Sequence, residues 1–292
     1  MQNLKIIHNY GFFSDCSIRL HGIIEYFNSE RTLPDDVDTT DMFGWYKLTL
    51  SHNDSVIETQ TNKELIQDIT FEYFTHYSEY ENINNTNMID YVESYQYANY
   101  SKLKYDDIVP FIKKYFSPSI EIQNIITNIE KKYSLSIEQT SESIVRPSKE
   151  LDYNNICVLY YRGNDKNTET QICGYDEYVL LAQDMLKKHP DICFLIQSDE
   201  TEFIEEMTLL FPNSFYFKEE IRHMPRQLTT VDMVMRENID IFSKNYLAIT
   251  IIMSKCKYII CGSGNCSIWI MLYRGNSNNV YQNINGKWIL NE

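Results

Sequence analysis

Short apolar runs alternate with helical patterns through the second half of the chain, and this alternation restricts the fold more than any other feature. The runs are continuously apolar, as in strands covered on both faces. The segments between them have the period of amphipathic helices. We therefore expect an α/β architecture with a parallel sheet between two helical layers. The predicted strands are 157–161, 192–199, 214–217, 257–264 and 279–282, and the predicted helices are 174–190, 201–212, 245–256 and 265–275.

The first half of the chain has a less regular pattern. A short apolar strand at 4–7 precedes a glycine turn and a helical pattern from 14 to 30, for which Ser14 or Asp15 is the expected N-cap. The helical period returns at 106–133, with a break at 117–119. Residues 4–30 therefore predict the opening of a second α/β unit.

Residues 70–105 are crowded with Tyr and Asn and follow no period. One interpretation is an irregular surface segment, since Asn, Ile, Lys and Tyr all use AT-rich codons. The other is an aromatic platform that binds an acceptor. The sequence leaves both interpretations open.

The chain has 292 residues, a length that fits two domains of ordinary size. Residues 134–150 are polar and lose the apolar period, as a linker would. We place the domain boundary there, with an N-terminal domain at 1–145 and a C-terminal domain at 146–292.

The formal net charge of -15 argues against a general affinity for nucleic acid, although a local basic pocket can still hold a small anion. No stretch approaches the roughly 18 apolar residues of a membrane span. The N-terminus lacks the basic and apolar regions of a signal peptide. We expect a soluble, cytoplasmic protein.

The seven cysteines lie mostly within or beside apolar runs, which favours buried thiols over a disulfide framework. A zinc site built from Cys256, Cys261 and Cys266 is disfavoured, because no CxxC pair exists and the histidines are remote in the sequence. We expect no bound metal and no cofactor.

Three polar segments follow predicted strands, at the edge where α/β sheets bind ligands. The first is RGNDK at 162–166, in which Arg162 offers a planar set of donors to phosphate oxygens and Gly163 allows close backbone approach. Its alternative is a surface salt bridge between Arg162 and Asp165. The second is Gln197-Ser198-Asp199, which is equally explained as a helix cap.

The third segment is CGSGNCS at 261–267, which joins a strand to a helix. Its glycines and serines expose backbone N–H groups at a helix N-terminus, where an anion is favoured. A tight turn without a ligand is the alternative. A cation and an amide-rich helix terminus at neighbouring strand ends would together bind a diphosphate without a metal, so we expect a nucleotide or a nucleotide-sugar.

These segments together resemble the GDP-fucose-dependent fucosyltransferases. The residues are a strand followed by YYRGNDK, then QSDE, then CKYIICGSGNCSIW. The first two are most similar to the α1,6 and protein O-fucosyltransferases, and the third to the α1,2 group. The resemblance covers about residues 155–282, and GFFSDCSIRLHGIIEYFN at 11–28 occupies the place of the family's N-terminal glycine loop and helix. Such enzymes occur in large DNA viruses and bacteria, and the codon bias fits either source.

The resemblance implies an inverting, metal-independent glycosyltransferase of the GT-B type, with two Rossmann-like domains facing a cleft. Its substrates would be GDP-fucose and a glycan acceptor. By position, Arg162 would bind the diphosphate, Glu169 would be the general base with Asp165 as the alternative, and Lys166 would take the place of a family lysine. The other positions implied for the donor site are Gly163, Tyr160, Asp199, Ser263, Gly264, Asn265 and Ser267, with Gly11 and Phe12 from the N-terminal half.

The chain departs from the family at three positions. The family's second arginine is Gly163, so one cationic contact is lost. Its histidine beside the guanine is Tyr160 and its aspartate falls at Ile249, and these two positions would read the base. Asp232 or His223 would be the substitutes, although each is equally explained as a surface or capping residue.

Four alternatives lie outside this assignment. A metal-dependent DxD transferase would use Asp36 and Asp38, which lie in a polar loop without a preceding apolar strand. The same fold with another donor, or a binding protein without turnover, would share the donor site. A hydrolase is disfavoured, because GxSxG is absent and Ser263 has no evident histidine partner.

Overall fold

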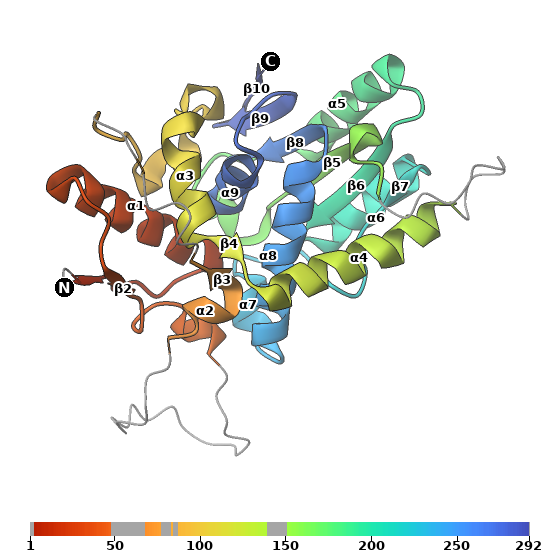
Figure 1. Cartoon of the computed structure of the whole chain (residues 1–292). Coiled ribbons are helices and arrows are strands. Elements are labelled where there is room, and N and C mark those ends of the chain that lie inside the picture. The colour runs from red at the N-terminus through yellow and green to blue at the C-terminus, as the bar shows by residue number, and fades with distance from the viewer. Residues whose placement is uncertain (1–2, 48–67, 77–82, 84–86, 139–150, 292) are drawn as a thin grey trace.

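A computed structural model describes residues 3–47, 68–76, 83, 87–138 and 151–291 of the chain (Figure 1). Its largest sheet has six strands in the order β10-β9-β8-β5-β6-β7, all parallel except β10, which runs antiparallel to β9. The strands are β5 (Ile156–Tyr161), β6 (Cys193–Ser198), β7 (Ser214–Phe215), β8 (Tyr258–Gly262), β9 (Val280–Ile284) and β10 (Lys287–Asn291). The parallel sheet is confirmed.

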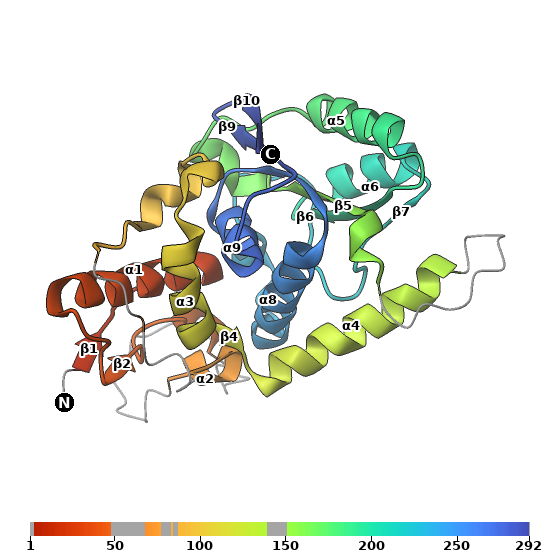
Figure 2. The ribbon, with the colours of Figure 1, turned by 45° about the horizontal axis from the view of Figure 1, so that its top comes forward.

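Every residue of β5 and β6 is buried, which accounts for their continuously apolar sequences. Figures 1 and 2 show α5 and α6 on one face of the sheet and α8 and α9 on the other. The helices of this half are α5 (Tyr175–Lys188), α6 (Thr201–Leu210), the short α7 (Val231–Val234), α8 (Ile239–Lys255) and α9 (Asn265–Arg274). The predicted three-layer arrangement is therefore confirmed.

The antiparallel strand β10 was not predicted. Asn285 and Gly286, which connect it to β9, both have positive φ angles, of 49° and 77°. Asn-Gly is the preferred sequence of a two-residue hairpin turn. The signal for this hairpin was thus present in the sequence.

The first half of the chain is mainly helical in its described residues. Its long helices are α1 (Phe12–Glu30), α3 (Tyr105–Tyr115) and α4 (Ile120–Glu138). Two small sheets accompany them, β1 (Asn3–Lys5) with β2 (Asp36–Asp38), and β3 (Phe74–Thr75) with β4 (Ser117–Pro118). The short helices are α2 (Thr70–Tyr73), η1 (Gly44–Tyr46), η3 (Glu93–Tyr97) and η4 (Tyr100–Lys102).

The described residues of 3–138 contain no sheet of more than two strands. No second Rossmann-like sheet is found among these described residues, and the two-domain GT-B arrangement that the resemblance implies stays a prediction. Helix α4 continues to Glu138, beyond the predicted start of the linker at residue 134. The domain boundary at 145/146 lies outside the described residues.

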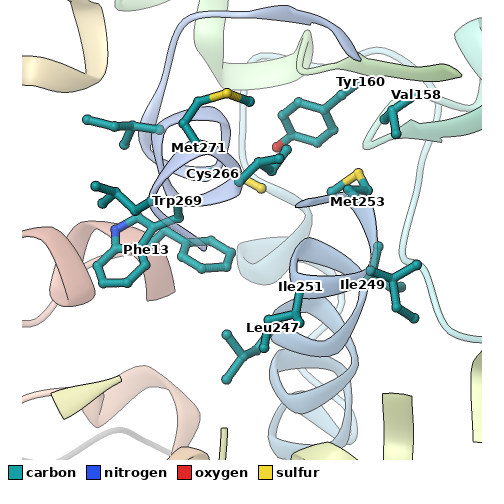
Figure 3. Close-up of a cluster of buried hydrophobic side chains, with 14 of the residues drawn as sticks. Phe13, Val158, Tyr160, Leu247, Ile249, Ile251, Met253, Cys266, Trp269 and Met271 are labelled. Atoms are coloured by element: carbon teal, nitrogen blue, oxygen red, sulfur yellow. The ribbon is translucent and has the colours of Figure 1, made fainter. Parts of the chain in front are cut away.

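The two halves share one apolar core, and Figure 3 shows a part of it in which Phe13 of α1 lies beside side chains of α9 and α8. The ring of Phe13 lies 6.1 Å from that of Trp269, and the ring of Phe116 lies 4.8 Å from it. The indole N–H of Trp269 donates to the hydroxyl of Ser17 at 3.0 Å. The N-terminal helices therefore form an additional layer over α8 and α9, as Figure 2 shows.

The Tyr-rich segment 70–105 is not a surface segment in its described parts. Four of its aromatic side chains are almost completely buried: Tyr73, Phe74, Tyr91 and Tyr100. The sequence did not predict this burial, because buried residues of turns and short helices follow no repeating spacing.

All seven cysteines are buried free thiols, in agreement with the prediction. No helix in the described part of the chain is long and apolar enough to cross a membrane.

Candidate functional site

The order of the sheet creates a switch point between β5 and β8. From β5 the chain proceeds to β6 and β7 on one side, then crosses back to β8 and β9 on the other. Tyr160 of β5 pairs with Cys261 of β8, so the segments that follow these strands lie next to each other. Ligands of open α/β sheets bind at such a crevice. Two of the three predicted segments, RGNDK and CGSGNCS, therefore meet here.

A cavity of about 340 Å³ opens at this point, a volume within the usual range of ligand sites. Both halves of the chain line it. The C-terminal half contributes Tyr160 to Arg162, Asp165, Lys166, Glu169 to Cys173, Tyr178, Thr230, Asp232, Tyr246, Gly262 to Ser267 and Asn283. The N-terminal half contributes Tyr10 to Ser14, Trp45, Tyr46 and Gln96.

Two helices begin at this cavity. Helix α9 starts at Asn265 after Gly264, whose φ of 155° disfavours any residue with a side chain. Helix α1 starts at Phe12 after Gly11, two residues before the predicted start. Helix N-termini carry partial positive charge and unpaired N–H groups. The cavity is therefore suited to an anion.

The prediction that Ser14 or Asp15 caps α1 is wrong. Asp15 is completely buried in the first turn, where its carboxylate accepts from the N–H groups of Tyr10 at 3.0 Å and Phe43 at 2.8 Å. The side chain of His8 lies 2.7 Å from the same carboxylate. Asp15 thus fixes the loops that precede α1 and η1, and Tyr10 and Tyr46 next to these contacts line the cavity.

Arg162 is held by two carboxylates. Its Nη2 donates to Asp165 Oδ1 at 2.9 Å, and its Nε lies 3.0 Å from Oδ2 of the buried Asp199. Burial alone would lower the pKa of Arg162, but the Asp199 carboxylate raises it. As a result, the pKa of Arg162 lies above its ordinary value. The Arg162–Asp165 ion pair, which was the alternative interpretation of this segment, is thus present. Arg162 lines the cavity, and two carboxylates balance its charge.

Asp199 also fixes the turn after β5. Its Oδ1 accepts from the N–H of Gly163 at 3.0 Å, and its backbone carbonyl accepts from the side chain of Asn164 at 2.8 Å. Burial raises the pKa of Asp199, an effect that the Arg162 charge opposes.

Gly163 has no room for a side chain. A Cβ atom there would lie 2.0 Å from the Oε1 of Glu200 and 2.7 Å from the ring of Tyr161. Glu200 is itself buried and bound to Arg226 at 3.1 Å. A residue with a side chain at position 163 would therefore require Glu200 and Tyr161 to move.

Lys166 crosses the start of α9. Its Cε lies 3.7 Å from the position of a Cβ on Gly264, and its ammonium group forms an ion pair with Oε2 of Glu169. The same oxygen accepts a hydrogen bond from Tyr97 at 2.8 Å. Lys166, Glu169 and the start of α9 are thus adjacent in the cavity.

The polar side chains of the CGSGNCS segment are partly engaged. Ser263 donates its hydroxyl hydrogen to the carbonyl of Asn283 at 2.7 Å. Asn265 accepts from Ser17 at 2.9 Å through its side-chain oxygen, so its amide nitrogen remains the group that can donate to a ligand. Ser267 is buried and also lines the cavity.

A second cavity of about 70 Å³ adjoins the first and shares Tyr160, Arg162 and Asp232 with it. Ile249 also lines this cavity, so both positions that would read the base reach it. Gln197 extends into it with a buried Oε1 that has no hydrogen-bond partner among the described residues. The second cavity therefore combines apolar surface with an open acceptor.

Of the two proposed substitutes for base recognition, only Asp232 lies at the site. Its Oδ2 accepts from the hydroxyl of Tyr46 at 3.1 Å, and that hydroxyl oxygen accepts from the N–H of Phe12 at 2.8 Å. His223 lines neither cavity, and its Nδ1 lies 2.8 Å from the hydroxyl of Thr201.

Two residues that the sequence did not single out, Tyr100 and Gln282, support the site without lining its cavities. Tyr100 accepts from the N–H of Gly264 at 3.2 Å and donates to the carbonyl of Gln96 at 2.9 Å. Gln282 accepts from the N–H of Tyr100 at 3.0 Å and donates to Ala98 at 2.8 Å. These contacts attach η3 and η4 to the CGSGNCS segment. No local sequence pattern predicts such contacts.

The DxD alternative lies elsewhere in the structure. Asp36 and Asp38 belong to β2, and neither lines the two cavities. Oδ1 of Asp38 accepts from Thr40 at 2.7 Å. Within the described residues no group of three or more His, Cys, Asp or Glu side chains is arranged to hold a metal.

No protein-family model and no curated protein sequence matches the chain. Among solved structures, it is similar to the NodZ alpha-1,6-fucosyltransferase soaked with GDP-fucose, with a TM-score of 0.40 and 12% identity over 65% of this chain. The same enzyme co-crystallized with GDP gives a TM-score of 0.38 and 12% identity over 64%. The matches span 54% and 52% of those chains, about half their length. A likeness of this extent is too distant to carry a conclusion about function.

Proposed function

We propose that the chain is a glycosyltransferase that takes a sugar from a nucleotide-sugar, with GDP-fucose as the first candidate donor, and transfers it to a glycan hydroxyl. The proposal includes inversion at the anomeric carbon and independence of a metal ion. It is supported by the sequence resemblance and by the geometry of the larger cavity.

One observation carries the proposal: the N-termini of α1 and α9 and the ammonium group of Lys166 meet at a single cavity. Helix N-termini and a lysine are the groups with which proteins bind phosphate. Such a site needs no metal, because the amides and the lysine would stabilise the charge that forms on the departing diphosphate.

Arg162 has a supporting role in this proposal. Two carboxylates already balance its charge, so Lys166 and the backbone amides would be the principal phosphate ligands. Arg162 would hold Asp199 and with it the turn that carries Lys166.

Glu169 is proposed as the general base. It lines the cavity beside Lys166, and its side chain is 40% exposed, so an acceptor hydroxyl can reach it. Inversion requires the hydroxyl to attack from the side opposite the leaving phosphate while the base removes its proton. Asp165 is the less suitable candidate, because its Oδ1 is bound to Arg162.

Isothermal titration calorimetry with GDP, UDP, ADP and CMP in the presence of EDTA tests the donor site. We expect GDP to bind, and we expect Lys166→Ala to weaken that binding about 10-fold or more, since hydrogen bonds to charged groups contribute about 1.5–3 kcal/mol. Lys187→Ala is the matched control, because Lys187 is exposed and pairs with Asp184 away from the cavity. Absence of binding by all four nucleotides, or equal affinity in the Lys166 variant, would contradict the proposal.

A further inference from the structure

Glu169 is held through one of its two carboxylate oxygens. The hydroxyl of Tyr97 donates to Oε2 at 2.8 Å, and Lys166 forms its ion pair with the same atom. For Oε1 no hydrogen bond is recorded from any described side chain or backbone group. Hydrogen bonding thus fixes Oε2, whereas Oε1 is available to accept a hydrogen bond from a ligand.

Tyr97 does not line the cavity, although Glu169 and the neighbouring Gln96 do. The segment that carries it is attached to the rest of the site by Tyr100, which is completely buried and hydrogen-bonded to Gly264. The position of the Tyr97 hydroxyl is therefore set by the same turn that begins α9.

Lys166 has one partner in the described part of the chain, Glu169, and a bound anion would be a second. Its ammonium group is bound to Glu169, but its side chain lies over Gly264, where an anion at the start of α9 would attract the same charge. The diphosphate of a nucleotide-sugar carries two negative charges, one on each phosphate, and would compete with the carboxylate for this ammonium group. Among the described residues, the Tyr97 hydroxyl has no hydrogen-bond partner other than Glu169.

We propose that Tyr97 is the positioning residue of Glu169: it holds Oε2 while the donor is bound and so keeps Oε1 directed at the acceptor hydroxyl. This inference rests on the proposed function, and it assigns the Tyr-rich segment a part in the reaction. Tyr97 would touch neither substrate and would act only through Glu169.

The protonation state of Tyr97 agrees with this role. Burial, followed by the hydrogen bond to Glu169, raises the pKa of Tyr97 above its ordinary value. The phenol therefore remains protonated throughout the neutral pH range and donates to the carboxylate.

Steady-state transfer assays on Tyr97→Phe test the inference, with GDP release as the readout. The ring is retained and only the hydroxyl is lost, so we expect kcat to fall about 10-fold, the effect of one hydrogen bond to a charged group. The KM for the donor should change less than about 2-fold, because Tyr97 does not line the cavity. Tyr95→Phe is the matched control: it lies in the same helix η3, its hydroxyl binds Asp90, and its kcat should equal that of the unaltered protein.

A double variant separates positioning from other roles. In a Glu169→Gln background, Tyr97→Phe should cause no further loss of kcat, since the group through which it acts is gone. An undiminished kcat in Tyr97→Phe, a full additional loss in the double variant, or a loss confined to donor KM would each overturn the inference.

The same assays distinguish the inference from the proposed function. If the unaltered protein releases no GDP with any acceptor, the proposed function fails and the inference falls with it. If the unaltered protein is active and Tyr97→Phe is equally active, only the inference fails. Equal denaturation midpoints for Tyr97→Phe and Tyr95→Phe would show that both variants fold.

Discussion

The two halves of the molecule differ in architecture and in the charged side chains that they bury. The C-terminal half is a parallel sheet in which β5, β6 and β8 bury nearly every side chain between helical layers. The described parts of the N-terminal half have only two-stranded sheets, although many of their apolar side chains belong to the common core. They also contain the two charged side chains with no exposed surface among the described residues, Asp15 and Arg19. Completely buried charge is thus concentrated in two groups of that half, which makes it sensitive to single substitutions and to pH.

Arg19 is the clearest example of this concentration. It is completely buried, its Nη1 donates to the carbonyl of Tyr115 at 2.8 Å, and its Nη2 lies 2.7 Å from His76 Nε2. Its guanidinium group lies 4.7 Å from the ring centroid of Phe116. Burial lowers the pKa of Arg19 to about 10, and no carboxylate within ion-pair distance of it is found in the described ranges.

We expect Arg19→Ala to have the largest effect, a loss of about 4 kcal/mol in the free energy of unfolding. The substitution leaves a cavity beside two aromatic rings and removes the donor to the Tyr115 carbonyl. Arg19→Met fills most of the volume, and its smaller loss would measure the hydrogen bonds alone. Urea denaturation gives both values, and a loss below about 1 kcal/mol in Arg19→Ala would refute the contrast between the halves.

The second largest effect should come from acidification. Burial and the nearby Arg19 charge lower the pKa of His76 to about 4, whereas an unfolded chain takes up this proton near pH 6.5. Between these values the unfolded state binds more protons, so the protein should lose up to about 3 kcal/mol as the pH falls from 6.5 to 4.

Denaturation curves over this pH range, compared with those of His76→Gln, isolate the contribution of the histidine. The variant should lack that part of the pH dependence. Parallel curves for the two proteins would show that His76 is not responsible.

The smallest effect is expected for the C-terminal half. Ile260 is completely buried in β8, and Ile260→Val removes one methylene group from a well-packed sheet. We expect a loss of about 1 kcal/mol in the same urea measurement. A loss as large as that of Arg19→Ala would mean that both halves concentrate their stability in single side chains.

The sequence predicted the C-terminal half well because local signals and burial coincide there. Strands such as β5 and β8 are apolar along their whole length, and the segments that follow them, at 162–166 and 262–267, meet at one cavity as expected. The hairpin to β10 had its Asn-Gly signal but was missed.

Apart from Gly11 and Phe12, the N-terminal contribution to the site was beyond sequence reasoning for a physical reason. Tyr46 reaches Asp232 and Tyr97 reaches Glu169 across large separations in the chain, and neither tyrosine belongs to a periodic pattern. Side-chain hydrogen bonds between distant segments leave no mark on local composition. Likewise, the pairing of Arg162 with Asp199 depends on the register of β5 and β6, which only the folded sheet defines.

The packing of Phe13 on Trp269 has a consequence for biosynthesis. A ribosome makes Trp269 long after Phe13, so the part of α1 that packs on α9 lacks this partner until then. At about 5–20 residues per second, the delay is roughly 10 to 50 s. During that time the apolar face of α1 is open to water, and the nascent chain would be a natural client of chaperones that shield such faces.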